Sequence, residues 1–103
     1  MDHRPMLQKT LEEIKGVTNV YFNPTVNTKM EYPCIKYSQS PRSAEFANDK
    51  RYIVHEAYTI IFITRDPTKA YEVLEQLEAI PFINSDTKYV ADGLHHYVYS
   101  KTY

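Results

Sequence analysis

The sequence predicts an α+β fold: a mainly antiparallel sheet of four to five strands, two helices on one face of it, and a long protruding β-hairpin. Two segments carry apolar residues at helical spacing, and the runs between them favour strands. One such run, Tyr52 to Thr64, would extend over roughly 43 Å at about 3.3 Å per residue. A domain of this length has a radius of gyration of only about 13 Å, so we expect part of this strand to project.

The length and charge of the chain exclude several classes of protein. Its 103 residues suffice for one domain with one core, which spans residues 1–103. The 12 basic and 13 acidic side chains give a formal net charge of −1, which argues against a duplex-DNA-binding protein. The single cysteine, Cys34, excludes an internal disulfide and fits a reducing cytoplasm. No apolar run approaches the ~20 residues of a membrane helix, so we expect a soluble intracellular protein without membrane contact.

The first part of the chain predicts one helix and two strands. Residues 5–15 have helical periodicity, with Pro5 in the first turn and Gly16 as the stop. A short strand at 19–22 and a polar, turn-rich loop follow. Residues 32–38 alternate as a strand with one buried face should. Pro33 places the start of that strand at a sheet edge or at its first residue.

Residues 40–51 connect this strand to the long one. If the two strands pair antiparallel, the connection is a twelve-residue hairpin loop, whereas most such loops have about two to five residues. Phe46 stands alone there among charged side chains. Two interpretations remain open: Phe46 folds back onto the domain, or it anchors a bound partner. The charged residues are Arg42, Glu45, Asp49, Lys50 and Arg51.

The second part of the chain predicts a helix and a terminal hairpin. Asp66 can cap a helix that begins near Pro67 and ends at Pro81. Asp92 and Gly93 lie between two alternating runs, which is a strong signal for a two-residue hairpin turn. The apolar face of the helix consists of Ala70, Val73, Leu74 and Leu77.

The sequence offers no candidate for catalysis or metal binding. His95 and His96 are neighbours on a strand, so their side chains point to opposite faces of the sheet. His55 and Cys34 could approach each other across paired strands, but no two ligand residues have the spacing of a zinc site. Neither of the two glycines belongs to a phosphate-binding loop. We therefore predict no catalytic residues, no metal and no cofactor, and we expect that the protein is not an enzyme.

Apolar residues on both faces of the sheet predict self-assembly. The chain has ten tyrosines, and Tyr97, Tyr99 and Tyr103 share one face of the last strand. Two short helices cover one face of a sheet, and a second copy of the protein is the simplest cover for the other. The alternative is that the loop after residue 22 and the protruding strand cover it within one chain. One side of the long strand carries Tyr52, Val54, Tyr58, Ile60 and Phe62, and the other carries Ile53, Ala57, Ile61 and Ile63.

Three stretches of the sequence resemble a family of small neck proteins of tailed phages and prophages. They are "EYPCIKY", "FANDKRYIVHEAYTIIFITRDP" and "IPFINSDTKYVADGLHHYVYSKTY". Members of the family are tail-completion, tail-terminator or head-to-tail joining proteins. The resemblance covers residues 17–103, and it departs from the family pattern at Asn48-Asp49, Gly93 and His95. The matching motifs are Tyr32-Pro33, Phe46-Ala47-Asn48-Asp49, Arg65-Asp66-Pro67 and Asp92-Gly93-Leu94-His95-His96.

The resemblance implies a structural assembly protein with a tail-terminator-like fold. Its copies would form a homo-oligomeric ring of six that ends the tail tube of a long-tailed phage and joins it to the head connector. The implied partners are the major tail tube protein and the neck proteins. The implied location is the virion, in the tail or neck, after assembly in the host bacterial cytoplasm. A nearly neutral ring would let DNA pass without specific binding.

Two other functions stay open: a head-side adaptor or head-closure ring, and a dimeric α+β domain that binds a small ligand. For the assembly function, we place the subunit or tail interface on the 40–51 connection and on the tyrosine-rich face. The interface residues are Arg42, Phe46, Lys50, Arg51, Tyr52, Tyr58, Tyr97, Tyr99 and Tyr103.

Overall fold

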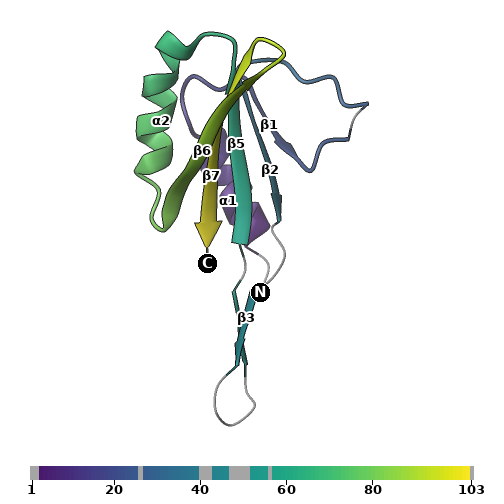
Figure 1. Ribbon diagram of the computed structural model, residues 1–103, viewed down its shortest axis with the longest axis vertical. Helices are drawn as coiled ribbons and strands as arrows, with labels where there is room; N and C mark the ends of the chain where they lie inside the picture. The colour runs from purple at the N-terminus through teal and green to yellow at the C-terminus, as the bar shows by residue number, and fades with distance from the viewer. Residues whose placement is uncertain (1–2, 26, 40–42, 47–51, 56, 103) are drawn as a thin grey trace.

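A computed structural model describes residues 3–25, 27–39, 43–46, 52–55 and 57–102. These residues form an α+β fold with a five-stranded mixed sheet, a separate two-stranded sheet and two α-helices (Figure 1). The expected fold class and the strand number of the main sheet are confirmed. The elements are α1 (Arg4–Glu12), β1 (Asn19–Phe22), β2 (Cys34–Gln39), β3 (Ser43–Phe46), β4 (Tyr52–His55), β5 (Ala57–Thr64), the 3-10 helix η1 (Pro67–Lys69), α2 (Ala70–Glu78), β6 (Ile83–Ala91) and β7 (Leu94–Thr102).

The main sheet has the strand order β1-β2-β5-β7-β6. Three neighbouring pairs are antiparallel, as expected, but β1 and β2 run parallel with Asn19 opposite Cys34. A parallel pair needs a connection long enough to return the chain to its starting end, and residues 23–33 provide it. The sequence did not predict this parallel pair, because strand direction depends on where the intervening loop leads the chain.

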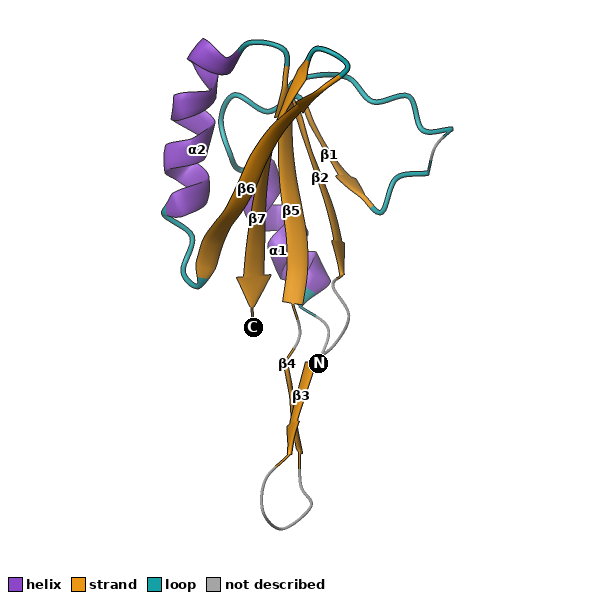
Figure 2. Cartoon of the chain, in the orientation of Figure 1, coloured by secondary structure: helices purple, strands orange, loops and turns teal. Residues whose placement is uncertain are grey.

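The long run of strand-forming residues is divided between two sheets. β5 pairs with β2 and β7 in the main sheet, so the expected antiparallel pairing of β2 with the long strand is confirmed. β4 instead pairs with β3, and Figure 2 shows these two strands beyond the end of the main sheet. The prediction of a loop over 40–51 was therefore wrong at residues 43–46. These residues form a strand because β4 offers partners for their backbone hydrogen-bonding groups.

The helices α1 and α2 lie against one face of the main sheet (Figure 1). The core of the chain lies between these helices and the sheet. The register aligns Ile35, Phe62 and Tyr97 across three strands on this face. Each fully buried apolar side chain stabilises the fold by about 1.5–3 kcal/mol relative to an exposed one. The buried cluster comprises Leu7, Leu11, Ile14, Ile35, Tyr37, Tyr58, Ile60, Phe62, Ala70, Val73, Leu77 and Tyr99.

One side chain of α2 links that helix to the segment that follows α1. Gln76 Oε1 accepts a hydrogen bond from Lys15 N, and Gln76 Nε2 donates one to Lys15 O, both at 2.9 Å. Gly16 follows with φ of +97°, and a Cβ at that position would lie 3.0 Å from Val73 Cγ2. Gly16 was predicted to end the helix, but the α-helix ends earlier, at Glu12. Gly16 instead changes the direction of the chain and lies in close contact with Val73 of α2.

The hairpin that joins β6 and β7 confirms the predicted turn. Ala91 pairs with Leu94, and the two residues between them, Asp92 and Gly93, have φ of +54° and +74°. Positive φ at both central residues is the geometry of the turn that matches the twist of paired strands. β6 begins at Ile83 and so extends further back than the alternating pattern predicted.

The second face of the main sheet is less apolar than the sequence led us to expect. Cys34, Ile63 and His96 align there and are buried within the chain. Ile61 and Val98 are only partly buried, and they are interspersed with polar residues. The expectation of a large uncovered apolar face therefore does not hold for this face. The polar residues beside Ile61 and Val98 are Lys36, Thr59 and Ser100.

Candidate functional site

In the described part of the chain, most of the large exposed apolar side chains belong to β6, its leading residue and α2. Phe82 directly precedes β6 and is 80 % exposed, with φ of +59°, an unusual conformation for a bulky residue. Tyr89 and Val90 lie near the end of β6, and Tyr71 on α2 is 72 % exposed. Met6 on α1 is the fifth such side chain. The uncovered apolar surface therefore follows one edge of the main sheet.

β6 forms that edge, and the seven residues between its first and last are all exposed. A bulge between Ser85 and Thr87 interrupts its pairing with β7, and Asp86 at the bulge accepts a hydrogen bond from Ser100 Oγ at 3.4 Å. Bulges and charges protect edge strands against pairing with strands of other chains. The bulge and Asp86 therefore hinder the pairing of another strand with β6.

A groove runs between α2 and β6. It consists of two adjoining hollows of about 490 and 450 Å³, which share Pro67, Tyr71, Lys88 and Tyr97. We call it the α2–β6 groove. The first hollow is also lined by Leu74, Glu75, Glu78, Ser85, Thr87 and Tyr99, and the second by Tyr89, Val90, His95 and His96.

The α2–β6 groove has a neutral aromatic floor and an acidic rim. Burial, and after it the nearby carboxylate of Glu78, raises the pKa of Tyr99 to about 12, so its hydroxyl stays neutral. Glu75 and Glu78 are exposed on the helix side, and Lys88 faces them from the strand side. This part of the surface is suited to a segment that carries both an apolar side chain and positive charge.

A stacked pair of rings forms the wall of the second hollow. Tyr89 and His96 have ring centroids 4.5 Å apart and planes within 8° of parallel. His96 Nδ1 lies 3.1 Å from the carbonyl oxygen of Leu94, a distance that suits a donated hydrogen bond. The histidine is buried and held in place, so it offers Tyr89 a fixed surface to stack on.

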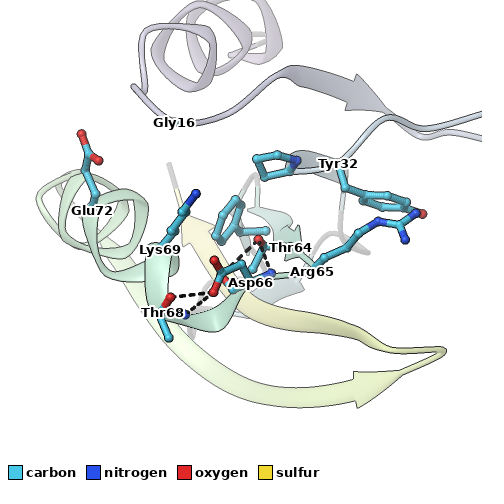
Figure 3. A pocket seen from close by; sticks show the side chains of 10 residues that line it. Gly16, Tyr32, Thr64, Arg65, Asp66, Thr68, Lys69 and Glu72 are labelled. Atoms are coloured by element: carbon cyan, nitrogen blue, oxygen red, sulfur yellow. Dashed lines mark hydrogen bonds between the residues drawn. The ribbon is translucent and has the colours of Figure 1, made fainter.

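A second cavity, of about 470 Å³, lies at the end of β5 where the chain enters η1 (Figure 3). We call it the terminal pocket. Phe62 and Pro33 contribute apolar surface, and Gly16 brings the end of α1 to its border. Figure 3 shows Arg65 alongside the ring of Tyr32, with Arg65 Cζ 5.5 Å from the ring centroid. The remaining lining residues are Thr64, Asp66, Thr68, Lys69 and Glu72.

The carboxylate in the terminal pocket is occupied by local structure. Asp66 Oδ1 accepts hydrogen bonds from Thr68 N at 3.0 Å and from Thr68 Oγ1 at 2.6 Å (Figure 3). These hydrogen bonds, the side-chain one first, lower the pKa of Asp66. A carboxylate with a lowered pKa that caps η1 is a poor general base. The hydrogen-bonding capacity of the Asp66 Oδ1 atom is thus used by the start of η1.

The structure places the predicted interface residues in three environments. Tyr58 and Tyr99 are buried in the core, 1 % and 3 % exposed, and Tyr97 is partly buried at the floor of the α2–β6 groove. The shared face of Tyr97 and Tyr99 was predicted correctly, but this is the face that α1 and α2 cover. Tyr58 and Tyr99 are thus core residues, which corrects their assignment to an exposed interface.

The remaining predicted residues belong to the connection or to the chain end. Phe46 and Tyr52 pair with each other across β3 and β4. Arg42, Lys50, Arg51 and Tyr103 lie outside the described residues.

Sequence reasoning missed the residues that line the α2–β6 groove on its outer side. Tyr71 lies off the apolar face of α2, and Tyr89 and Val90 are consecutive on β6, which alternation alone cannot assign to one surface. The available signal was Tyr71 itself, a large apolar side chain on the polar side of a helix. Glu75 and Glu78 looked like ordinary solvated charge, because their relation to β6 arises only in the folded chain.

Comparisons with known proteins assign no family to the chain: no protein-family model matches it, and a search of the curated proteins finds no significant match. Among the described residues, no three His, Cys, Asp or Glu side chains gather closely enough to hold a metal ion. The helices in the same part of the chain are too short or too polar to span a membrane.

Proposed function

We propose that this protein is a structural assembly protein of a long-tailed phage neck. In this proposal its copies form a hexameric ring that ends the tail tube and joins it to the head connector. β3 and β4 are part of a long hairpin that reaches from each subunit to its neighbour or to the tail tube. Double-stranded DNA passes through the ring, whose subunits have a formal net charge of −1, without being held.

The uncovered apolar surface along β6 and α2 is the observation that carries this proposal. Tyr71, Tyr89 and Val90 are exposed and line one hollow together, and Phe82, 80 % exposed, lies before the other end of β6. Monomeric proteins rarely leave adjoining large apolar side chains in contact with water, and such patches mark interaction sites. An assembly protein provides a cover for this surface in the form of its own neighbours.

The motifs of the family resemblance support the proposal through their positions in the fold. Tyr32-Pro33 directly precedes β2, and Arg65-Asp66-Pro67 leads from β5 into η1. Asp92-Gly93 forms the tight turn between β6 and β7. These three motifs therefore have local structural roles, as would be expected of positions that define a shared fold.

Deletion of residues 41–49 tests the proposal. The deletion removes all of β3 but none of the residues of the main sheet or its core. We expect a protein that unfolds cooperatively, has the circular dichroism of an α+β fold, and no longer forms rings. Light scattering and negative-stain images of the purified proteins, alone and mixed with tail tubes of the same phage, measure this.

Two results would contradict the proposal. One is that the shortened protein forms the same rings and completes tails as the full chain does. The other is that the full chain forms no ring, either alone or on tail tubes. A head-side adaptor or head-closure ring is the nearest alternative, and co-purification with filled heads rather than with isolated tails would identify it.

The terminal pocket favours a second candidate function, the binding of a small ligand by a dimeric domain. Its volume of about 470 Å³ falls within the range of small-molecule sites, and it combines Phe62 and Pro33 with the cations of Arg65 and Lys69. A ligand with an apolar body and an anionic group would fit this lining. A saturable rise in the unfolding temperature with such a metabolite, abolished by Arg65→Ala, would support this function over ring assembly.

A further inference from the structure

Phe82 combines an exposed ring with a backbone conformation that is unfavourable for phenylalanine. Its φ of +59° lies in the left-handed region, where glycine and asparagine are common and a bulky residue is an outlier. The side chain is 80 % exposed, so the core of the chain does not require it. Residues that are kept in costly backbone conformations cluster at functional sites. An exposed phenylalanine at such a position is therefore suited to contact with a partner.

Two contacts hold Phe82 in place before β6. Its carbonyl oxygen accepts a hydrogen bond from Thr102 N at 3.3 Å, which ties its backbone to the end of β7. Lys101 Nζ lies 5.7 Å from the centroid of its ring, within the range of a cation–π contact. The ring is thus presented from a paired region of the fold. A side chain that is held in this way loses less conformational freedom when a partner binds it.

The second hollow of the α2–β6 groove has the properties of a receiving site for such a ring. It has a volume of about 450 Å³, and the exposed side chains of Tyr71, Tyr89 and Val90 contribute to its lining. None of the described residues that line it is acidic, whereas Glu75 and Glu78 line the first hollow. A phenylalanine buries about 150–250 Å² and packs well against other aromatic rings. The second hollow is therefore the part of the groove that fits an aromatic side chain.

A subunit cannot place Phe82 in its own second hollow. Figure 1 shows β6 running from the loop after α2 to the turn before β7. Phe82 precedes the first residue of β6, and Tyr89 and Val90 lie near its other end. The strand between Phe82 and Tyr89 spans about 23 Å at about 3.3 Å per residue. The ring of Phe82 therefore reaches a second hollow only in another copy of the chain.

We propose that Phe82 of one copy enters the second hollow of the α2–β6 groove of another copy and lies against Tyr71, Tyr89 and Val90. This inference rests on the proposed assembly function and adds one contact to it. Phe82 and the hollow are different parts of the molecule, so the contact is heterologous, and repeated around an axis it closes a ring. The contact joins side chains, so the bulge that protects β6 against strand pairing does not oppose it.

The Phe82→Asn variant separates the contact from the stability of the fold. Asparagine adopts positive φ more readily than phenylalanine, so the unfolding temperature should equal or exceed that of the original protein. Self-association should weaken about tenfold or more, measured by analytical ultracentrifugation, because an aromatic anchor is lost. Met6→Gln is the matched control: it replaces another exposed apolar side chain, on α1, that lines neither hollow.

A second variant tests the receiving side of the contact. Val90→Glu places a charge in the second hollow and leaves Phe82 unchanged, so it should weaken self-association about tenfold as well. An equimolar mixture of Phe82→Asn and Val90→Glu should associate more strongly than either variant alone, because one ring and one intact hollow remain in each unlike pair. Native mass spectrometry with one variant labelled with nitrogen-15 identifies these pairs. A mixture that associates no more strongly than its components overturns the inference.

The outcomes separate this inference from the proposed function. Rings that form equally well with Phe82→Asn overturn the contact and leave ring assembly in place. Loss of association with Met6→Gln to the same extent also overturns it, since any exposed apolar side chain would then have the same effect. If Phe82→Asn abolishes binding to tail tubes but not association between copies, Phe82 contacts the tube and the second copy is the wrong partner. Failure of the unaltered protein to associate at all, alone and on tail tubes, contradicts both.

Discussion

Two glycines with positive φ differ in what surrounds them. Gly16 has φ of +97° and lies against Val73, whereas Gly93 has φ of +74° and nothing within 4 Å of the position of a Cβ. Both backbone conformations are unfavourable for residues with a side chain. Only at Gly16 would the side chain also enter the packed contact between the end of α1 and α2.

Alanine at these two positions should separate backbone strain from packing. Gly93→Ala should lower the free energy of unfolding by about 1–2 kcal/mol, the cost of a left-handed conformation. Gly16→Ala should lower the free energy of unfolding by about 1 kcal/mol or more beyond the loss at Gly93, because Val73 must also move. Urea denaturation of both variants measures the difference. Equal decreases in the free energy of unfolding at the two sites would show that Val73 can move aside without loss of stability.

At the level of elements, the main sheet brings α1 and α2 together but does not by itself fix the junction between them. Gln76 makes that connection through both polar atoms of its amide, to the backbone N and O of Lys15. The same Nε2 also donates to Glu72 O at 3.0 Å. Gly16, which follows Lys15, lines the terminal pocket, so the junction lies at the border of that cavity.

Replacement of Gln76 should loosen this junction in steps. Gln76→Ala removes both hydrogen bonds to Lys15 and the one to Glu72 O, and it should lower the free energy of unfolding by about 1 kcal/mol, in the range of such exposed bonds. Gln76→Glu keeps an acceptor for Lys15 N and loses the donor to Lys15 O, so we expect an intermediate loss. Thermal denaturation compares the two variants. A Gln76→Glu variant less stable than Gln76→Ala would show that repulsion from the Lys15 carbonyl dominates.

β6 shows how one element can belong to the fold and still remain available to a partner. β7 holds it by backbone pairing on one side, and its buried contribution is confined to its two ends. Phe82, Tyr89 and Val90 are therefore exposed although they belong to a well-paired region of the chain. An edge strand of this kind adds little to the core and much to the surface.

At the scale of the whole molecule, the burial of a thiol and a tyrosine hydroxyl makes the stability of the fold decrease at alkaline pH. Burial raises the pKa of the Cys34 thiol from 9.0 to about 11 and that of the Tyr99 hydroxyl from 10.0 to about 12. Both groups are neutral when protonated, so the unfolded chain releases these protons at lower pH than the folded one does. Their contribution is complete below about pH 9 and is lost as the pH rises towards 12. Burial lowers the pKa of Lys101, which opposes this trend up to about pH 10.5.

The contribution of the thiol can be isolated with Cys34→Ala. The variant should be less stable than the original protein at pH 7.5, because a buried side chain is shortened. At pH 10.5 the difference between the two urea midpoints should shrink, since the original protein has by then lost part of the thiol contribution. A difference that is the same at both pH values would contradict the raised pKa.

The charges of the molecule acquire meaning only when they are placed in the fold. A formal net charge of −1 conceals an acidic α2, which carries three glutamates and no lysine or arginine. The exposed glutamates Glu75 and Glu78 line the α2–β6 groove, so the acidic charge of the helix is concentrated beside exposed aromatic side chains.

The sequence by itself determined the local structure of this protein. Pro5 and Pro67 mark the first turns of their helical segments, and Asp92-Gly93 forms a two-residue turn, because these residues restrict or permit backbone angles that neighbours do not change. Alternation of apolar residues predicted the strand at residues 32–38, which the structure has as β2 (Cys34–Gln39). The same pattern grouped Tyr97 with Tyr99 correctly.

Only the tertiary structure decided which surfaces are covered. Whether the face of Tyr58 and Tyr99 lies under the helices or in solvent depends on where α1 and α2 pack, and no local pattern contains that information. The division of the long run between β4 and β5, the parallel β1–β2 pair and the α2–β6 groove arise in the same way, from contacts between residues far apart in the chain. Backbone preferences act over a few residues, whereas burial is a property of the assembled layers of helices and strands.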